Sequence, residues 1–162
     1  MTETLKERNE DMLQIRKILC PTDFSEPSYL GLKKARDFGE HFSAELLVVH
    51  VVPLAHFISY PGSGFNVAAD YFESLTDAAR SSLEEVRKNR LPPDLVVRTF
   101  ILQGSPADQI IDLAGSEKVD MIVTATHGWT GWRKFVFGSV AEKVVRLSPC
   151  PVFTVPAPEG AS

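Results

Sequence analysis

The sequence contains no apolar run that approaches the ~20 residues needed to cross a membrane. Its first 13 residues are polar and charged and lack the apolar segment of a signal peptide. Only two cysteines occur, Cys20 and Cys150, and neither has a partner at metal-ligand spacing, so neither a disulfide framework nor a zinc site is indicated. We expect a cytoplasmic protein in which both cysteines act as small hydrophobic residues.

An excess of basic residues is also missing. The chain has 21 acidic against 17 basic residues, a net charge of −4, which argues against a general nucleic-acid-binding protein. A small anionic ligand needs only a local positive field. The segment 121–141 contains no Asp or Glu and carries both Arg133 and Lys134. The sequence therefore places a locally basic segment in an acidic domain.

Apolar strands and amphipathic helices alternate along the 162 residues, which is enough chain for one α/β domain. We predict strands at 15–20, 46–52, 95–102, 121–125 and 151–155, and helices at 26–41, 67–89, 106–116 and 139–147. The run at 46–52, apolar except for His50, indicates a strand buried on both faces, as in a parallel sheet. Right-handed crossovers favour a three-layer, Rossmann-like sheet of order 3-2-1-4-5. The domain should span 14–157, between tails at 1–13 and 158–162.

Two helix starts carry capping-box patterns. Ser105 is followed by Pro106 and then by Asp108, which predicts that Ser105 caps the helix. Ser139 with Glu142 three residues later repeats the pattern. The Ser139 hydroxyl has two interpretations, as a cap or as a donor to a phosphate group.

The start of the first helix indicates that Asp23 is not its cap. If Asp23 were the cap, Pro27 would stand at the fourth helical position, where its missing N–H removes a helix hydrogen bond. With Ser25 as the cap, Pro27 falls in the first turn and removes none. We therefore expect the Asp23 carboxylate to remain available for a ligand.

Ligands of such sheets bind beyond the carboxyl ends of the strands, where the strand order reverses. That point lies between the first and fourth strands, so segments 21–25 and 126–139 should face each other. The second segment has glycines at 128, 131 and 138 and ends at a helix N-terminus, which favours an anion. Neither a Walker loop nor a Rossmann glycine fingerprint is present.

Several stretches carry a family resemblance: ILCPTDFS at 18–25, HV at 50–51, THG at 126–128, GSVAEKVV at 138–145 and PCPV at 149–152. Over about residues 15–156 the chain resembles the universal stress protein family. The resemblance implies a five-stranded parallel sheet. The nucleotide-binding branch of the family carries the pattern G-x2-G-x9-G-[ST] and binds ATP without a Walker loop. On this sequence the pattern falls on Ala125, Gly128 and Gly138-Ser139, with alanine in place of the first glycine.

The resemblance also implies a role for each residue of the nucleotide site. Asp23 and Val51 would contact adenine, Pro21 and Thr22 would shape that wall, Thr124 and Ala125 would line the ribose, and Gly128, Gly138, Ser139 and Val140 would hold the phosphates through backbone N–H groups. The residues themselves give Arg133 and Lys134 two interpretations, as positive charge on the phosphate side or as a solvated surface pair. Mg²⁺ or Mn²⁺ would bridge the phosphates of the bound nucleotide.

Ala125 separates the functional hypotheses. Its methyl group would cost ~1–2 kcal/mol if the position required a left-handed backbone. The leading hypothesis is an ATP-binding regulatory or sensor domain with at most slow ATP hydrolysis. The alternative is an interaction module of the same fold that binds no nucleotide. An enzyme of the wider adenine nucleotide α-hydrolase-like group is a third hypothesis, although its first-loop pyrophosphate motif is missing.

A homodimer is the expected assembly. The predicted order places the apolar strand 151–155 at an edge of the sheet, and an open apolar edge invites aggregation. Pairing the same edge across a two-fold axis closes it. Dimers of this kind are also what the family resemblance implies, and we expect no nucleic-acid or membrane partner.

Overall fold

The computed structural model describes residues 14–53, 65–126 and 137–156. Its strands and helices follow one another along the chain as β1 (Lys17–Pro21), α2 (Glu26–Phe42), β2 (Glu45–Pro53), α3 (Phe65–Arg90), β3 (Val97–Gly104), α4 (Pro106–Ser116), β4 (Met121–Ala125), α5 (Ser139–Leu147) and β5 (Val152–Val155). The strands form one parallel sheet of order β3-β2-β1-β4-β5. The predicted fold class, strand order and elements are confirmed.

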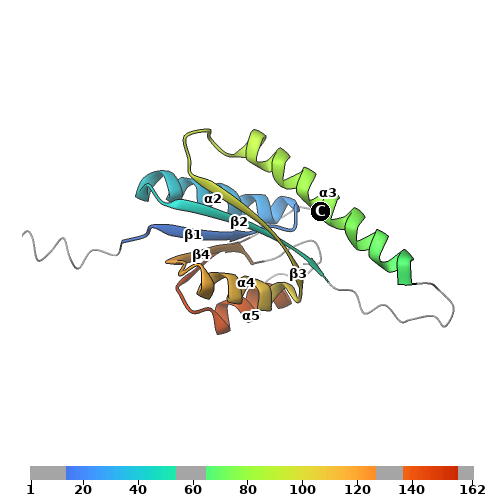
Figure 1. The fold of residues 1–162 in the computed structure, drawn as a ribbon. Coiled ribbons are helices and arrows are strands. Elements are labelled where there is room, and N and C mark those ends of the chain that lie inside the picture. The colour runs from blue at the N-terminus through green and yellow to red at the C-terminus, as the bar shows by residue number, and fades with distance from the viewer. Residues whose placement is uncertain (1–13, 54–64, 127–136, 157–162) are drawn as a thin grey trace, which may run out of the picture.

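Helices cover both faces of the sheet (Figure 1). Helices α2 and α3 lie on one face, and α4 and α5 lie on the other. Successive strand residues point to opposite faces, so Ile18 and Cys20 belong to the core under α2 and α3, while Leu19 belongs to the core under α4 and α5. This double burial explains why β2 is apolar at every position from 46 to 52 except His50. None of the helices in the described ranges is long and apolar enough to span a membrane.

The two cysteines differ in burial. Cys20 lies in the core under α2 and α3, and burial raises the pKa of its thiol to about 12. It is therefore the inert hydrophobic residue that the sequence predicts. Cys150 is half-buried, and its backbone N–H donates to the Ser148 hydroxyl at 3.2 Å.

Ser25 caps α2 as predicted, because its hydroxyl accepts a hydrogen bond from the Ser28 N–H. Ser105 is confirmed as the N-cap residue of α4, whereas Ser139 is not a cap. Ser105 stands at the cap position of α4, but its side chain makes no capping bond and instead hydrogen-bonds Asp108. The cap of α5 is Gly138. The first helix hydrogen bond runs from Glu142 N–H to the Gly138 carbonyl, so Ser139 becomes the first helical residue.

Candidate functional site

The sheet reverses its order where β1 and β4 lie side by side. Ile18 pairs with Met121 and Leu19 with Ile122, so both strands end at the same edge of the sheet. Beyond β4, the Gly138 N–H donates to the Thr126 carbonyl at 2.8 Å, which ties the start of α5 to the end of this strand. The structure therefore brings together segments 21–25, 124–126 and 138–140, as the predicted topology requires.

Three of the predicted wall residues share one face of the sheet. Val51 is buried in the core under α4 and α5. Cys20 and Val123 point to the opposite face, toward α2 and α3. Because successive strand residues alternate, Pro21 and Thr124, the next residues of β1 and β4, lie on the face of Val51. Val51 and Thr124 are each 8% exposed. These residues form a nearly solvent-excluded surface at the carboxyl end of the central strands.

Ala125 occupies the last position of β4 in an extended conformation and pairs with Val155 of β5. It is not among the described residues with positive φ, so the strain that a left-handed backbone would impose on alanine does not arise. The alternation of β4 places its methyl group on the α2 face, away from the face of Val51 and Thr124. Alanine therefore fits this position without conformational cost.

Helix α2 approaches the same strand end very closely. A Cβ atom added to Gly31 would lie 3.2 Å from the backbone nitrogen of Ala125 and 3.5 Å from the carbonyl carbon of Thr124. This distance is shorter than most Cβ contacts, so a larger residue at position 31 would shift α2 or the β4 end by a few tenths of an ångström. Glycine at this position therefore favours the close approach of α2 to the end of β4.

Thr22 fixes the loop between β1 and α2 from inside. Its N–H donates to the Val49 carbonyl at 2.9 Å, and its carbonyl lies 2.8 Å from Nδ1 of His50. Its hydroxyl accepts from the Phe24 N–H at 3.1 Å and lies 3.0 Å from the Ser28 hydroxyl oxygen. The side chain is 5% exposed. Thr22 thus shapes this wall through the loop backbone that it holds.

Asp23 is exposed at the tip of this loop, and its carboxylate is engaged within the loop. Oδ1 accepts the Ser25 N–H at 3.1 Å and the Ser25 hydroxyl at 2.5 Å. Asp23 is therefore not the cap of α2, as predicted, but its carboxylate has a partner inside the loop, and its availability to a ligand stays a prediction. The reason is that Ser25 Oγ accepts from the Ser28 N–H and can donate its own proton to Asp23. The two residues form an Asx-type turn that orients the carboxylate.

Phe24 is a functional-site feature that the sequence did not reveal. It has φ +64°, a left-handed conformation that costs a bulky residue ~1–2 kcal/mol. Its ring stacks on His50 at a centroid distance of 4.4 Å and packs against the core under α2 and α3. Such strain persists only where surrounding contacts enforce it, and it concentrates at functional sites. A histidine at the end of β2 was the available signal, but nothing in the sequence pairs it with Phe24.

The N-terminus of α5 offers backbone donors at the same edge. Helix geometry leaves the N–H groups of Ser139, Val140 and Ala141 without partners inside the helix. Ser139 and Val140 are exposed, and the helix dipole favours an anion there. The Gly138 N–H, predicted as a phosphate donor, is taken by Thr126. Gly138 therefore contributes as the cap that positions the donors after it.

A basic and an acidic side chain link α4 and α5 close to this helix start. Lys143 Nζ lies 2.6 Å from Asp108 Oδ1. The hydrogen bonds from Lys143 and Ser105 hold the pKa of Asp108 below its ordinary value. The remaining predicted residues of the site, Gly128, Arg133 and Lys134, lie outside the described residues. Within the described ranges, no group of three His, Cys, Asp or Glu residues is placed to hold a metal ion.

Comparison with known proteins agrees with the fold. The family model of the universal stress protein family matches residues 14–156. Universal stress protein MJ0531 of Methanocaldococcus jannaschii is 33% identical over 144 residues, which cover 89% of this chain and 84% of the relative. Universal stress protein MJ0577 of the same organism is 30% identical over 152 residues, which cover 86% and 94%.

Solved structures show the same similarity. The structure of MJ0577 superposes with a TM-score of 0.80 at 29% identity, covering 91% of this chain and 99% of that one. A universal stress protein from Archaeoglobus fulgidus, solved in complex with dAMP, has a TM-score of 0.53 at 20% identity and covers 88% and 98%. The second likeness shows a shared fold alone. With a family model that covers most of its length and relatives at 30% identity or more, the chain belongs to the universal stress protein family.

Proposed function

We propose that this protein binds ATP and acts as a nucleotide-dependent regulatory or sensor domain, with at most slow ATP hydrolysis. The observation that carries the proposal is the convergence of three segments at the reversal point of the sheet. The oriented Asp23 carboxylate, the wall of Val51 and Thr124, and the exposed backbone donors of Ser139 and Val140 all lie at this edge. They supply the three kinds of contact that an adenine nucleotide needs.

Each part of the nucleotide has a proposed partner. Asp23 accepts a hydrogen bond from adenine, which packs on Val51 and Pro21 and against the loop that Thr22 holds. The Thr124 side chain and the backbone of Ala125 line the ribose. The phosphates bind the backbone N–H groups that follow the Gly138 cap, together with Gly128 of the family pattern, and Arg133 and Lys134 add positive charge. Mg²⁺ or Mn²⁺ would bridge the phosphate oxygens of the bound nucleotide.

A regulatory role is favoured over an efficient enzyme by the acidic groups near α5. Rapid phosphoryl transfer needs a residue that orients water and acidic metal ligands beside the phosphates. In the described part of the chain, Asp108 is occupied by Lys143, and Glu142 is an exposed residue of the first turn of α5. With neither Asp108 nor Glu142 placed for catalysis, we favour a domain whose state changes when the nucleotide binds.

Calorimetric titration of the full chain with ATP tests the proposal. We expect micromolar-range affinity, a loss of tenfold or more in Asp23→Ala, and a comparable loss in Gly128→Val. Asp112→Ala is the matched control, because Asp112 is exposed on α4 and makes no ion pair among the described residues. It should bind ATP like the parent protein. Absence of binding at millimolar ATP overturns the proposal.

The homodimer is part of the same proposal. Strand β5 ends the sheet beside β4, and its Phe153 is 41% exposed. Phe42 of α2 is 40% exposed, and Phe38 of the same helix packs edge-on against Phe153 at 5.0 Å and at a tilt against Phe42 at 6.2 Å. Pairing of two β5 edges would cover these rings. Sedimentation at tens of micromolar should show a dimer that Phe153→Lys weakens, and a parent protein that is monomeric there contradicts it.

A further inference from the structure

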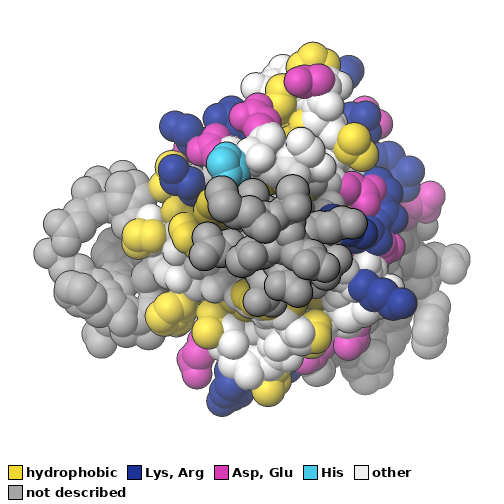
Figure 2. All heavy atoms as spheres, turned by 90° about the vertical axis from the view of Figure 1, so that its left-hand side faces the viewer, with side chains coloured by type: hydrophobic (Ala, Val, Ile, Leu, Met, Phe, Trp, Pro, Cys, Tyr) yellow, Lys and Arg dark blue, Asp and Glu magenta, His cyan; other side chains and the backbone are white. Residues whose placement is uncertain are grey.

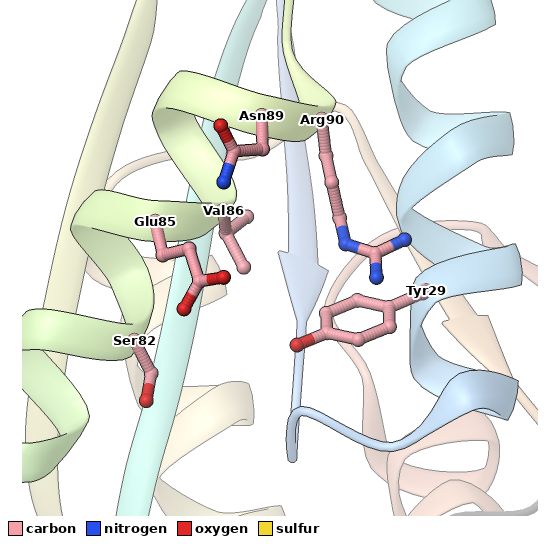
Figure 3. Close-up of a pocket in the computed structure, with 6 residues that line it drawn as sticks. All are labelled: Tyr29, Ser82, Glu85, Val86, Asn89 and Arg90. Atoms are coloured by element: carbon pink, nitrogen blue, oxygen red, sulfur yellow. The ribbon is translucent and has the colours of Figure 1, made fainter.

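Helices α2 and α3 enclose a cleft on the face of the sheet opposite Val51 and Thr124. Two adjoining cavities of about 290 and about 270 Å³ share Tyr29 of α2 and Asn89 and Arg90 of α3. Figure 3 shows Ser82, Glu85 and Asn89 along α3, with Arg90 extending from the end of the same helix toward the Tyr29 ring of α2. The proposed nucleotide contacts use neither cavity.

The second cavity is basic, although the whole chain is acidic. Lys33, Arg36 and Arg90 line it together with a single acidic residue, Glu26. Lys33 makes no ion pair with any described residue, and the Arg90 guanidinium lies 4.0 Å from Glu26, beyond hydrogen-bond length. The Glu26 side chain is 82% exposed and can turn into solvent. Lys33 is therefore the basic residue of this cavity without an ion-pair partner in the described ranges, and Arg90 is only loosely paired.

Arg90 is held in place by an aromatic ring. Its guanidinium carbon lies 3.6 Å from the centroid of the Tyr29 ring, and Figure 3 shows the two groups stacked. Stacking occupies the flat face of the guanidinium and leaves the N–H donors at its edge directed sideways. Arg36 has fewer donors available to a ligand, because its Nη2 already donates to Asp37 Oδ1 at 3.0 Å. Arg90 and Lys33 are thus the principal donors to the cavity.

We propose that this cleft binds a small phosphate-bearing anion. Lys33 and Arg36 come from α2 and Arg90 and Asn89 from α3, so a ligand between the helices meets donors from two sides. A tetrahedral phosphate presents oxygens in several directions and suits this arrangement better than a planar carboxylate. Lysine and arginine donate only, and guanidinium edges match phosphate oxygens. The second cavity, of about 270 Å³, has room for such a ligand, whereas Glu85 makes the first cavity less favourable for an anion.

The test is a titration of the nucleotide-free full chain with inorganic pyrophosphate at constant ionic strength, followed by NMR. We expect saturable shifts of the Asn89 side-chain amide and the Tyr29 ring. Lys33→Gln and Arg90→Gln should each weaken this binding at least fivefold. Lys34→Gln is the matched control, because it removes the same charge from the adjacent residue, which does not line the cleft. It should change the affinity by less than twofold.

The outcomes separate this site from the proposed nucleotide site. Shifts confined to the Ser139 and Val140 amides would place pyrophosphate at α5 and overturn the cleft proposal. Equal weakening by Lys33→Gln and Lys34→Gln, or shifts that do not saturate, would also overturn it by showing diffuse charge attraction. Arg90→Gln also removes the contact with the Tyr29 ring and could destabilise the fold. Lys33 is exposed, so Lys33→Gln tests the site even if the arginine variant unfolds. Failure of ATP binding leaves these expected results unchanged.

Discussion

The two ends of the sheet use their polar groups differently. At the amino end, Arg98 donates from Nε to Glu45 at 2.7 Å and from Nη2 to Glu117 at 2.6 Å, and Lys17 lies 3.4 Å from Glu117. Figure 2 views this end, where basic and acidic side chains lie interspersed. At the carboxyl end, the exposed Asp23 carboxylate is held by Ser25 within its loop, and the first N–H groups of α5 have no partners inside the helix. The amino end pairs opposite charges with one another, and the carboxyl end places a carboxylate beside exposed backbone donors.

The backbone follows the same division. Positive φ occurs at Ser43 and Lys118 of the amino end, where each directly follows or nearly follows the end of a helix, the usual place for this conformation. At the carboxyl end it occurs at Phe24, between a strand and a helix, and is enforced by the stack on His50. Strain is therefore stored beside the candidate site, while the amino end closes with ordinary helix caps.

The largest stability effect should come from glycines placed at opposite ends. Gly31→Val puts side-chain atoms against the backbone of Ala125, because an added Cβ would lie only 3.2 Å from the Ala125 nitrogen. This variant should lower the free energy of unfolding by roughly 1–3 kcal/mol. Gly115 of α4 has no atom within 4 Å of an added Cβ, so Gly115→Val should change it by less than about 0.5 kcal/mol. Urea denaturation measures both. Equal losses would show that the carboxyl end is not the more tightly packed one.

The strain at Phe24 predicts that a glycine variant is more stable than an alanine variant, the reverse of the usual order. Phe24→Ala and Phe24→Gly both lose the ring, but only glycine relieves the positive φ, so the glycine variant should be more stable by about 1 kcal/mol. At an ordinary position glycine is the less stable of the two. Denaturant melts of the two variants provide the comparison. If Phe24→Ala is the more stable variant, the loop is not strained.

These two positions also show how far the sequence predicts the structure. The alternation of apolar strands and helices, and the break that Pro27 would impose, were enough for the strand order and for the Ser25 cap. Gly31 and Phe24 depend on distances between segments far apart in the chain, which no local pattern encodes. The same limit explains Asp23 and Gly138: their predicted places in the chain agree with the structure, but their hydrogen-bond partners, Ser25 and Thr126, follow from three-dimensional closure.

The paired charges of the amino end predict an acid-dependent loss of stability. Hydrogen bonds from Arg98, and then from Lys17, hold the pKa of Glu117 below its ordinary value of 4.5 in the folded protein. A lowered pKa stabilises the fold above the unfolded value, and this contribution disappears as the pH falls through the folded value. Glu117→Gln should therefore lower the Tm by roughly 2–4 °C at pH 7 and make little difference near pH 3.

Thermal melts between pH 3 and 7 test this prediction, with ATP affinity at pH 7 as a second measurement. Because Glu117 lies at the end of α4 remote from segments 21–25 and 138–140, the affinity should stay within about twofold of the parent value. A Tm difference that is the same at pH 3 and pH 7 would mean that the ionised carboxylate is not what stabilises this end. A large loss of ATP affinity would mean that the two ends are coupled.

The smallest expected effect belongs to Ala125, the departure from the family pattern at the carboxyl end. Because Ala125 is extended and its methyl group lies on the α2 face, Ala125→Gly removes no strain and opens little space for ribose. ATP affinity should change by less than about twofold, and calorimetry of the two proteins side by side resolves that. A gain of tenfold or more, corresponding to about 1.4 kcal/mol, would show that the natural site is impaired and would favour an interaction module. An unchanged affinity makes alanine a neutral member of a working nucleotide site.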